Sequence, residues 1–136
     1  MEDETRQGYG FSTDMFVTRK ANGESVIVGG TSADTSRWIR ILSHRAAQLL
    51  LSQMTQMLHP EKVSGITGAM MTAPMRDANR PTITTHMDVD KLTDEDGFNI
   101  TGWAGDKRWD ANLTPEEVER FWTALSVALD PKGKMQ

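Results

Sequence analysis

Residues 113–129 read Leu-Thr-Pro-Glu-Glu-Val-Glu-Arg-Phe-Trp-Thr-Ala-Leu-Ser-Val-Ala-Leu and contain a full set of helix signals. Thr114 is a favourable N-cap, Pro115 suits the first helical position, and Glu117 is placed to complete a capping box. The apolar residues that follow recur at the helical period and form one stripe. The sequence therefore predicts a helix over 115–129 that packs one face against a core. The stripe consists of Val118, Phe121, Trp122, Leu125, Ala128 and Leu129.

A second and longer helix is predicted over 36–58. A polar cap among residues 34–36 can start it, and His59-Pro60 stops it. Its apolar residues gather on a broad arc at the helical period, and a few more lie at or beyond the margin of that arc. Because this is more apolar surface than one core stripe requires, we expect the extra residues to form a contact in a homo-oligomer. These residues are Leu51, Met54 and Leu58.

Several strands are predicted around these helices. Two runs of strand-forming residues near the N-terminus flank Asn22-Gly23, the strongest short signal for a β-hairpin. Residues 82–89 alternate between apolar and polar side chains, which predicts a half-buried strand, and 98–103 should return beside it after an acidic turn. A strand over 63–73 and an exposed loop over 74–81 complete the order.

The order of strands, helix, strands and helix predicts an α+β fold. We expect a curved antiparallel sheet with both helices packed on one face, and two halves that share one plan. Gly102 and Gly105 predict a bulge or bend before Trp109.

Length and composition favour one soluble domain. The chain has 136 residues, no cysteine and a net charge of −4. No apolar run approaches the ~18 residues of a membrane span, and the acidic start does not resemble a signal peptide. We expect a flexible acidic arm over 1–10, a single domain over 11–130, a flexible tail over 131–136, and a cytoplasmic location without membrane contact.

The sequence offers little for metal or catalytic chemistry. Without cysteine there is no thiolate zinc site and no cysteine nucleophile. The three histidines, His44, His59 and His86, lack the short spacing of zinc ligands. Asp88 and Asp90 beside His86 could form an acid–base pair, but polar residues on a half-exposed strand explain them equally well. With no catalytic motif, we expect a non-enzyme that uses no metal or cofactor.

Basic and aromatic residues are interleaved in two parts of the chain. Trp103 and Trp109 flank Lys107-Arg108, a mixture that could stack bases and hold phosphates. Arg76 and Arg80 lie in the predicted loop and would add phosphate contacts. Two alternatives stay open: both tryptophans could pack under the final helix, and the arginines of the first helix could simply be solvated.

Residues 98–125 resemble the closing module of PC4-type single-stranded-DNA-binding transcriptional cofactors. They read Phe-Asn-Ile-Thr-Gly-Trp-Ala-Gly-Asp-Lys-Arg-Trp-Asp-Ala-Asn-Leu-Thr-Pro-Glu-Glu-Val-Glu-Arg-Phe-Trp-Thr-Ala-Leu, which places a strand, a basic turn and a Leu-Thr-x-Glu-Glu helix in the family's order. The order of elements in the whole chain also resembles that of the Whirly proteins, although their Lys-Gly-Lys-Ala-Ala-Leu motif is missing. The resemblance implies an oligomer that binds unpaired DNA or RNA across its exposed sheet.

The resulting hypothesis is non-catalytic binding of single-stranded nucleic acid by a regulator associated with transcription. The expected contacts are Arg76, Arg80, Trp103, Lys107, Arg108 and Trp109. The alternative is a protein-interaction module, an accessory subunit that docks on a larger complex. That alternative explains the acidic net charge directly, since it needs no continuous basic track.

Overall fold

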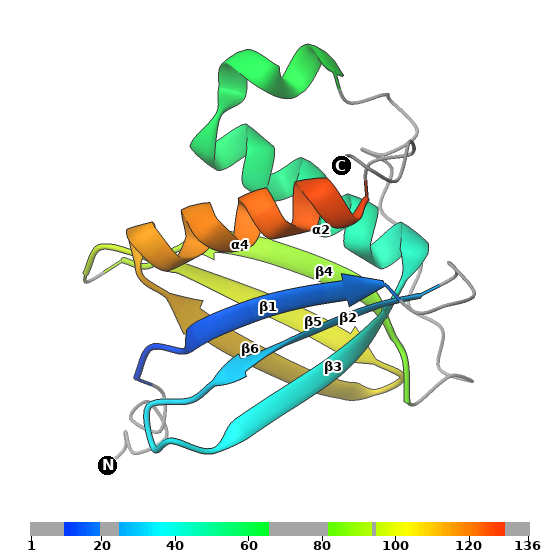
Figure 1. Cartoon of the computed structure of the whole chain (residues 1–136), viewed down its shortest axis with the longest axis vertical. Helices are drawn as coiled ribbons and strands as arrows, with labels where there is room; N and C mark the ends of the chain where they lie inside the picture. Colours follow the sequence, from blue (N-terminus) through cyan, green and yellow to red (C-terminus); the bar gives the residue numbers. More distant parts are fainter. Residues whose placement is uncertain (1–9, 20–24, 66–81, 94, 130–136) are drawn as a thin grey trace.

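The computed structural model describes residues 10–19, 25–65, 82–93 and 95–129 (Figure 1). Three strands precede a helix, and three further strands precede a second helix. The strands are β1 (Thr13–Arg19), β2 (Ser25–Thr31), β3 (Arg37–Ser43), β4 (Thr84–Lys91), β5 (Phe98–Ala104) and β6 (Lys107–Leu113); the helices are α2 (His44–Leu58), the 3-10 helix η1 (Pro60–Gly65) and α4 (Pro115–Ala128).

The six strands form one sheet in sequence order, from β1 to β6. All neighbours are antiparallel except β3 and β4, which are parallel. The expected purely antiparallel sheet is therefore wrong in this one place. Helix α2 carries the chain back along the sheet between β3 and β4, so β4 starts in the direction of β3. The α+β class with two main helices is confirmed.

The sheet curves strongly, so that β1–β3 face β4–β6 below the helices (Figure 1). Trp38 on β3 and Trp109 on β6 are three strands apart in sheet order, yet their ring centroids are 5.6 Å apart. A backbone hydrogen bond from the Ser12 N–H to the Asn112 carbonyl, 2.8 Å long, joins the start of β1 to β6.

Both helices cover the inner face of the sheet, as predicted. Side chains that point inward from β2, β3, β4 and β5 meet the apolar stripes of α2 and α4, which explains why these positions are the most deeply buried. The largest fully buried side chains include Val26, Val28, Leu42, Leu50, Met54, Met87, Ile100, Phe121 and Leu125.

The first predicted helix is wrong over 37–43. These residues form β3, and α2 begins only at His44, where the Ser43 hydroxyl accepts from the Ala46 N–H at 3.1 Å. Pairing with β2 turns Arg40 and Leu42 toward the inner face, opposite Val28 and Val26. The apolar positions in this stretch fit both the strand period of two and the helical period, and the pairing partner decides between them.

The final helix is confirmed, with one change at its start. The Thr114 hydroxyl caps α4 by accepting from the Glu117 N–H at 3.1 Å. Glu117 does not close a capping box, because its Oε2 accepts from the Met15 N–H of β1 at 3.0 Å and its Oε1 pairs with Arg120. The buried carboxylate thus ties the first strand to the last helix.

The remaining local predictions have mixed outcomes. The N-terminal hairpin strands pair as expected, although the turn at 20–24 lies outside the described residues. The strands predicted at 82–89 and 98–103 are confirmed as β4 and β5. The strand predicted over 63–73 is wrong at its start, where η1 occupies the chain. The rest of that strand, the 74–81 loop, the terminal tail and all but the end of the acidic arm lie outside the described residues.

The expected bulge at Gly102 is wrong. Gly102 pairs regularly with Trp109, and a Cβ there would lie 2.5 Å from the indole ring, so glycine is needed for close packing. Gly105 does mark a bend, since its φ of 62° shapes the turn between β5 and β6. Among the described helices, none is long and apolar enough to cross a membrane.

Candidate nucleic-acid interface

A slot opens in the sheet beside the first half of β3. Among the described residues, β3 pairs with β4 only at Leu42 and Thr84, so residues 37–41 have no strand neighbour on that side. The turn between β5 and β6 faces this gap and leaves a cavity of about 380 Å³. Its lining consists of Ile39, Arg40, Ile41, Thr82, Thr84, Ala104, Lys107, Arg108 and Trp109, hereafter the basic slot.

Arg40 is the innermost cation of the basic slot. Its guanidinium carbon lies 5.7 Å from the Trp38 ring centroid and 5.3 Å from that of Trp109. Its Nη1 donates to the carbonyl of Ile39 at 2.9 Å, which fixes the side chain against its own strand. Partial burial beside the two indoles lowers the pKa of Arg40, and the group forms no ion pair with a described acid. A partly desolvated cation without a counterion favours binding of an anion.

Lys107 and Arg108 supply the outer cations. They follow the turn at Gly105 and begin β6, where both side chains are exposed. Arg108 also pairs with Asp110 through an Nη2–Oδ2 distance of 3.4 Å. Both residues are mostly in water, so this pair is weak and leaves the guanidinium able to exchange partners.

A second cavity of about 200 Å³ lies on the other side of Arg40. It shares Arg40 and Trp109 with the basic slot and adds Trp38, Ser12 and Asn112 to its lining. The indole N–H of Trp38 donates to the Ser12 hydroxyl at 3.2 Å. The Arg40 and Trp109 side chains therefore form the partition between two hollows.

The two tryptophans of the sequence hypothesis do not form one platform. Trp109 is only 9% exposed, points inward, and donates from Nε1 to the Thr84 hydroxyl at 2.8 Å. Trp103 lies opposite Arg108 on β6 and His86 on β4, which places it half-buried on the outer face. Stacking of a base on the face of Trp109 is therefore corrected to a packing role at the edge of the basic slot.

The outer face of β4–β6 is poorly suited to phosphate. Asp88 and Asp110 are both about half exposed there, and Asp90 is exposed as well. Asp88 also lies 3.5 Å from the Nε2 of His86, so the suggested acid–base pair is a contact on an open strand face. These carboxylates repel a phosphate chain that crosses the sheet beside Trp103.

The other predicted contacts fall into two groups. Arg76 and Arg80 lie outside the described residues. In the predicted oligomer surface, Met54 is fully buried in its own protomer, while Leu51 and Leu58 pack against the same core. The apolar arc of α2 is broad because the sheet and α4 cover it from two sides. The surface predicted to contact a second subunit is therefore largely covered by the chain itself.

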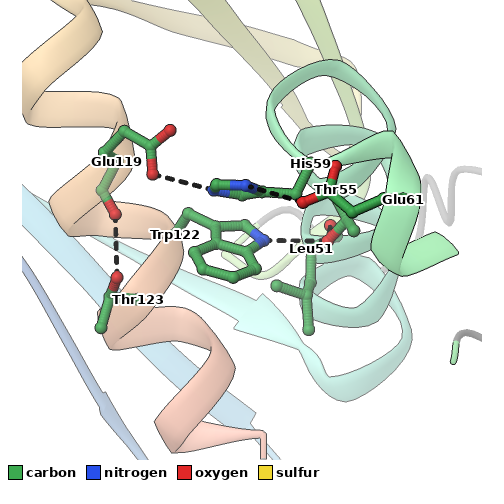
Figure 2. Close-up of polar contacts among 7 residues, drawn as sticks. All are labelled: Leu51, Thr55, His59, Glu61, Glu119, Trp122 and Thr123. Atoms are coloured by element: carbon green, nitrogen blue, oxygen red, sulfur yellow. Dashed lines mark hydrogen bonds and ion pairs between the residues drawn. The ribbon is translucent and has the colours of Figure 1, made fainter.

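Figure 2 shows a cluster at the far end of α2 that contains a histidine between carboxylates. The Nε2 of His59 lies 2.9 Å from Glu119 on α4, its Nδ1 lies 3.7 Å from Glu61, and its ring packs on Trp122 at 4.4 Å. The Trp122 N–H donates to the Thr55 hydroxyl at 2.9 Å. Both imidazole nitrogens face carboxylates, so the cluster fastens α4 to the end of α2.

Two cavities with different charged linings lie at the two ends of β4. The basic slot is at Thr84, where β4 begins, whereas a groove of about 580 Å³ lies where β4 ends at Lys91. Glu95, Asp96 and Glu119 line that groove. An acidic protein can in this way present a local basic site. In the described part of the chain, no group of three or more histidine, aspartate or glutamate side chains could hold a metal ion.

Sequence reasoning missed Trp38 and Arg40, because both were assigned to a helix. The available signal was the alternation of Trp38, Arg40 and Leu42 with the β-branched Ile39 and Ile41.

No protein-family model matches the sequence, and no curated protein shows significant similarity to it.

Proposed function

We propose that this protein binds single-stranded nucleic acid without catalysis and that the basic slot holds its phosphates. The observation that carries the proposal is the convergence of Arg40 from β3 with Lys107 and Arg108 from β6 on one cavity. Neutralisation of phosphates is the main source of affinity for nucleic acid. A cavity of about 380 Å³ has room for part of one strand, whereas the paired strands of a duplex cannot enter it.

The proposal retains some of the contacts predicted from the sequence and adds one that the sequence did not predict. Lys107 and Arg108 stay as phosphate contacts, Arg40 joins them, and the half-buried Trp103 is the aromatic that could stack a neighbouring base. Arg76 and Arg80 remain candidate contacts by sequence alone. A PC4-like or Whirly-like role in transcription, a homo-oligomeric state and a cytoplasmic location are part of the same proposal, and the resemblance within 98–129 supports the first of them.

The test is a fluorescence-anisotropy titration with unpaired and duplex oligonucleotides at ~50 mM salt, where phosphate contacts are strongest. Lys107→Ala with Arg108→Ala should weaken every unpaired sequence alike. Since each lost contact removes about 0.7 from the slope of log K against log salt, the slope should fall by about 1.4. The matched control is Arg19→Ala with Lys91→Ala, which removes the same charge from exposed strand ends.

Three results would contradict the proposal. A folded sample that binds neither oligonucleotide would exclude it, and so would equal weakening by the slot pair and the control pair, which would indicate a net-charge effect only. Preference for duplex would also count against the slot.

The second candidate is the protein-interaction module, and one observation favours it. Ile39 is 57% exposed on the outer face of the sheet, beside Ile41 on the same strand and Ile27 on β2. Exposed apolar patches mark contact surfaces. A stoichiometric protein partner recovered after nuclease treatment, and lost on Ile39→Glu, would favour this candidate.

A further inference from the structure

The basic slot is lined by hydrogen-bond donors and by no described carboxylate. Besides its three cations it contains the hydroxyls of Thr82 and Thr84. Thr84 Oγ1 accepts from the Trp109 indole at 2.8 Å, so its own O–H can point into the cavity. A group rich in acceptors and carrying negative charge fits such a lining, and a phosphate group has both properties.

Buried side chains line the inner end of the slot. Trp109 and Thr84 are buried there, and the guanidinium of Arg40 lies beside the paired rings of Trp38 and Trp109, 5.7 Å and 5.3 Å from their centroids. A phosphodiester inside a strand continues in two directions, so its two flanking nucleotides limit how closely it approaches Arg40 in a cavity of about 380 Å³. A terminal phosphate is attached on one side only and can reach it.

The charges of the slot and of the phosphate also favour a terminal phosphate. A phosphodiester carries one negative charge, whereas a terminal phosphate monoester carries about −1.5 to −2 at pH 7. Arg40, Lys107 and Arg108 together present three positive charges to the slot, one of them shared with Asp110. Ile39 and Ile41 line the same cavity and give the sugar or base of the end nucleotide an apolar contact.

We infer that the basic slot recognises the terminal phosphate monoester of an unpaired strand, with Arg40 as the group that contacts it at the inner end. This inference depends on the proposed function, because it names which part of the strand the site receives. The same chemistry is offered by free nucleoside monophosphates and by inorganic phosphate, so the experiment separates these sources.

The experiment compares one unpaired sequence in three forms: with a 5′-phosphate, with a 3′-phosphate, and with hydroxyls at both ends. Anisotropy at moderate salt should give at least one phosphorylated form an affinity about tenfold higher than the hydroxyl form, equivalent to about 1.4 kcal/mol. Arg40→Gln should bring the ratio of the affinities for the phosphorylated and hydroxyl forms close to one, whereas Arg19→Gln should leave that ratio unchanged. Circular dichroism checks that both variants fold.

The ratio of the affinities for the phosphorylated and hydroxyl forms, measured with the wild-type protein, tests the inference even if Arg40→Gln fails to fold. Equal binding of all three forms overturns this inference and leaves the proposed function standing. If no oligonucleotide binds but calorimetry detects a nucleoside monophosphate or inorganic phosphate, the proposed function fails and the slot is a site for a small phosphate ester. If none of these probes binds, both are overturned.

Discussion

Replacing Gly102 with alanine tests how tightly the Trp109 indole packs on β5 behind the basic slot. A Cβ at this position would lie 2.5–2.6 Å from three atoms of the Trp109 indole. The ring has little freedom to withdraw, because its N–H is bonded to Thr84 and its face lies against Trp38 and Arg40. The substitution must therefore displace the indole or bend β5.

The expected loss of stability combines three contributions. Overpacking a tight core costs about 1–3 kcal/mol, and breaking the bond between Trp109 and Thr84 leaves a buried donor at a cost of about 1–3 kcal/mol. Alanine in a strand returns about 0.5–1 kcal/mol relative to glycine. The net expectation is about 1–5 kcal/mol, and a loss of about 3 kcal/mol, near the middle of that range, lowers the melting temperature by roughly 10 °C for a chain of this size.

Thermal and urea denaturation measure this effect, with Gly30→Ala as the control. A Cβ on Gly30 would chiefly meet the Sδ atom of Met15, the far part of a flexible side chain, so its cost should be the smaller of the two. In a Trp109→Leu background the cost of Gly102→Ala should fall by at least about 1 kcal/mol, because the clashing ring is gone. An unchanged melting temperature, or an identical cost in both backgrounds, would refute the reasoning.

Two further predictions concern local hydrogen bonds. Trp122→Phe keeps an aromatic ring against His59 but removes the bond to Thr55, so urea denaturation should show a loss of about 0.5–1.5 kcal/mol, and an unchanged midpoint would contradict it. Hydrogen bonds from the hydroxyl and the N–H of Ser36 lower the pKa of Asp34 below its ordinary 3.8. Its stabilisation is therefore present above that ordinary value and lost as the pH falls through the lower folded value. Asp34→Asn should flatten the stability curve as the pH falls below the ordinary value, and an unaltered curve would argue against this bond.

The parts of the fold that sequence predicts well are those decided by neighbouring residues. The cap at Thr114 and the stripe behind it locate α4 to within a residue of its end. The flanking runs around Asn22-Gly23 likewise pair as β1 and β2. In both cases the signal and the structure that it specifies lie a few residues apart, so no distant partner can override it.

The failures share a different cause. Residues 37–43 fit both periods, and pairing with β2 makes them a strand. Glu117 would suit a capping box, but the Met15 N–H, 102 positions away, takes its carboxylate. Glycine in a strand is typical of a bulge, yet at Gly102 the ring of Trp109 on the next strand leaves no room for a side chain. Each outcome is set by a contact with another strand or helix, which the local pattern does not identify.

The candidate site likewise depends on contacts between separate elements. Helix α2 returns the chain to the side of β3 in parallel, and in the described part of the chain β4 pairs with β3 only at Leu42, near its end. No described strand lies beside the first half of β3 on that side, and the turn that carries Lys107 faces the resulting gap. Because side chains alternate along β3, Arg40 is placed at the gap between β3 and the turn that joins β5 to β6. A basic site in an acidic chain thus arises from where the crossover joins the sheet, which local patterns in the sequence do not contain.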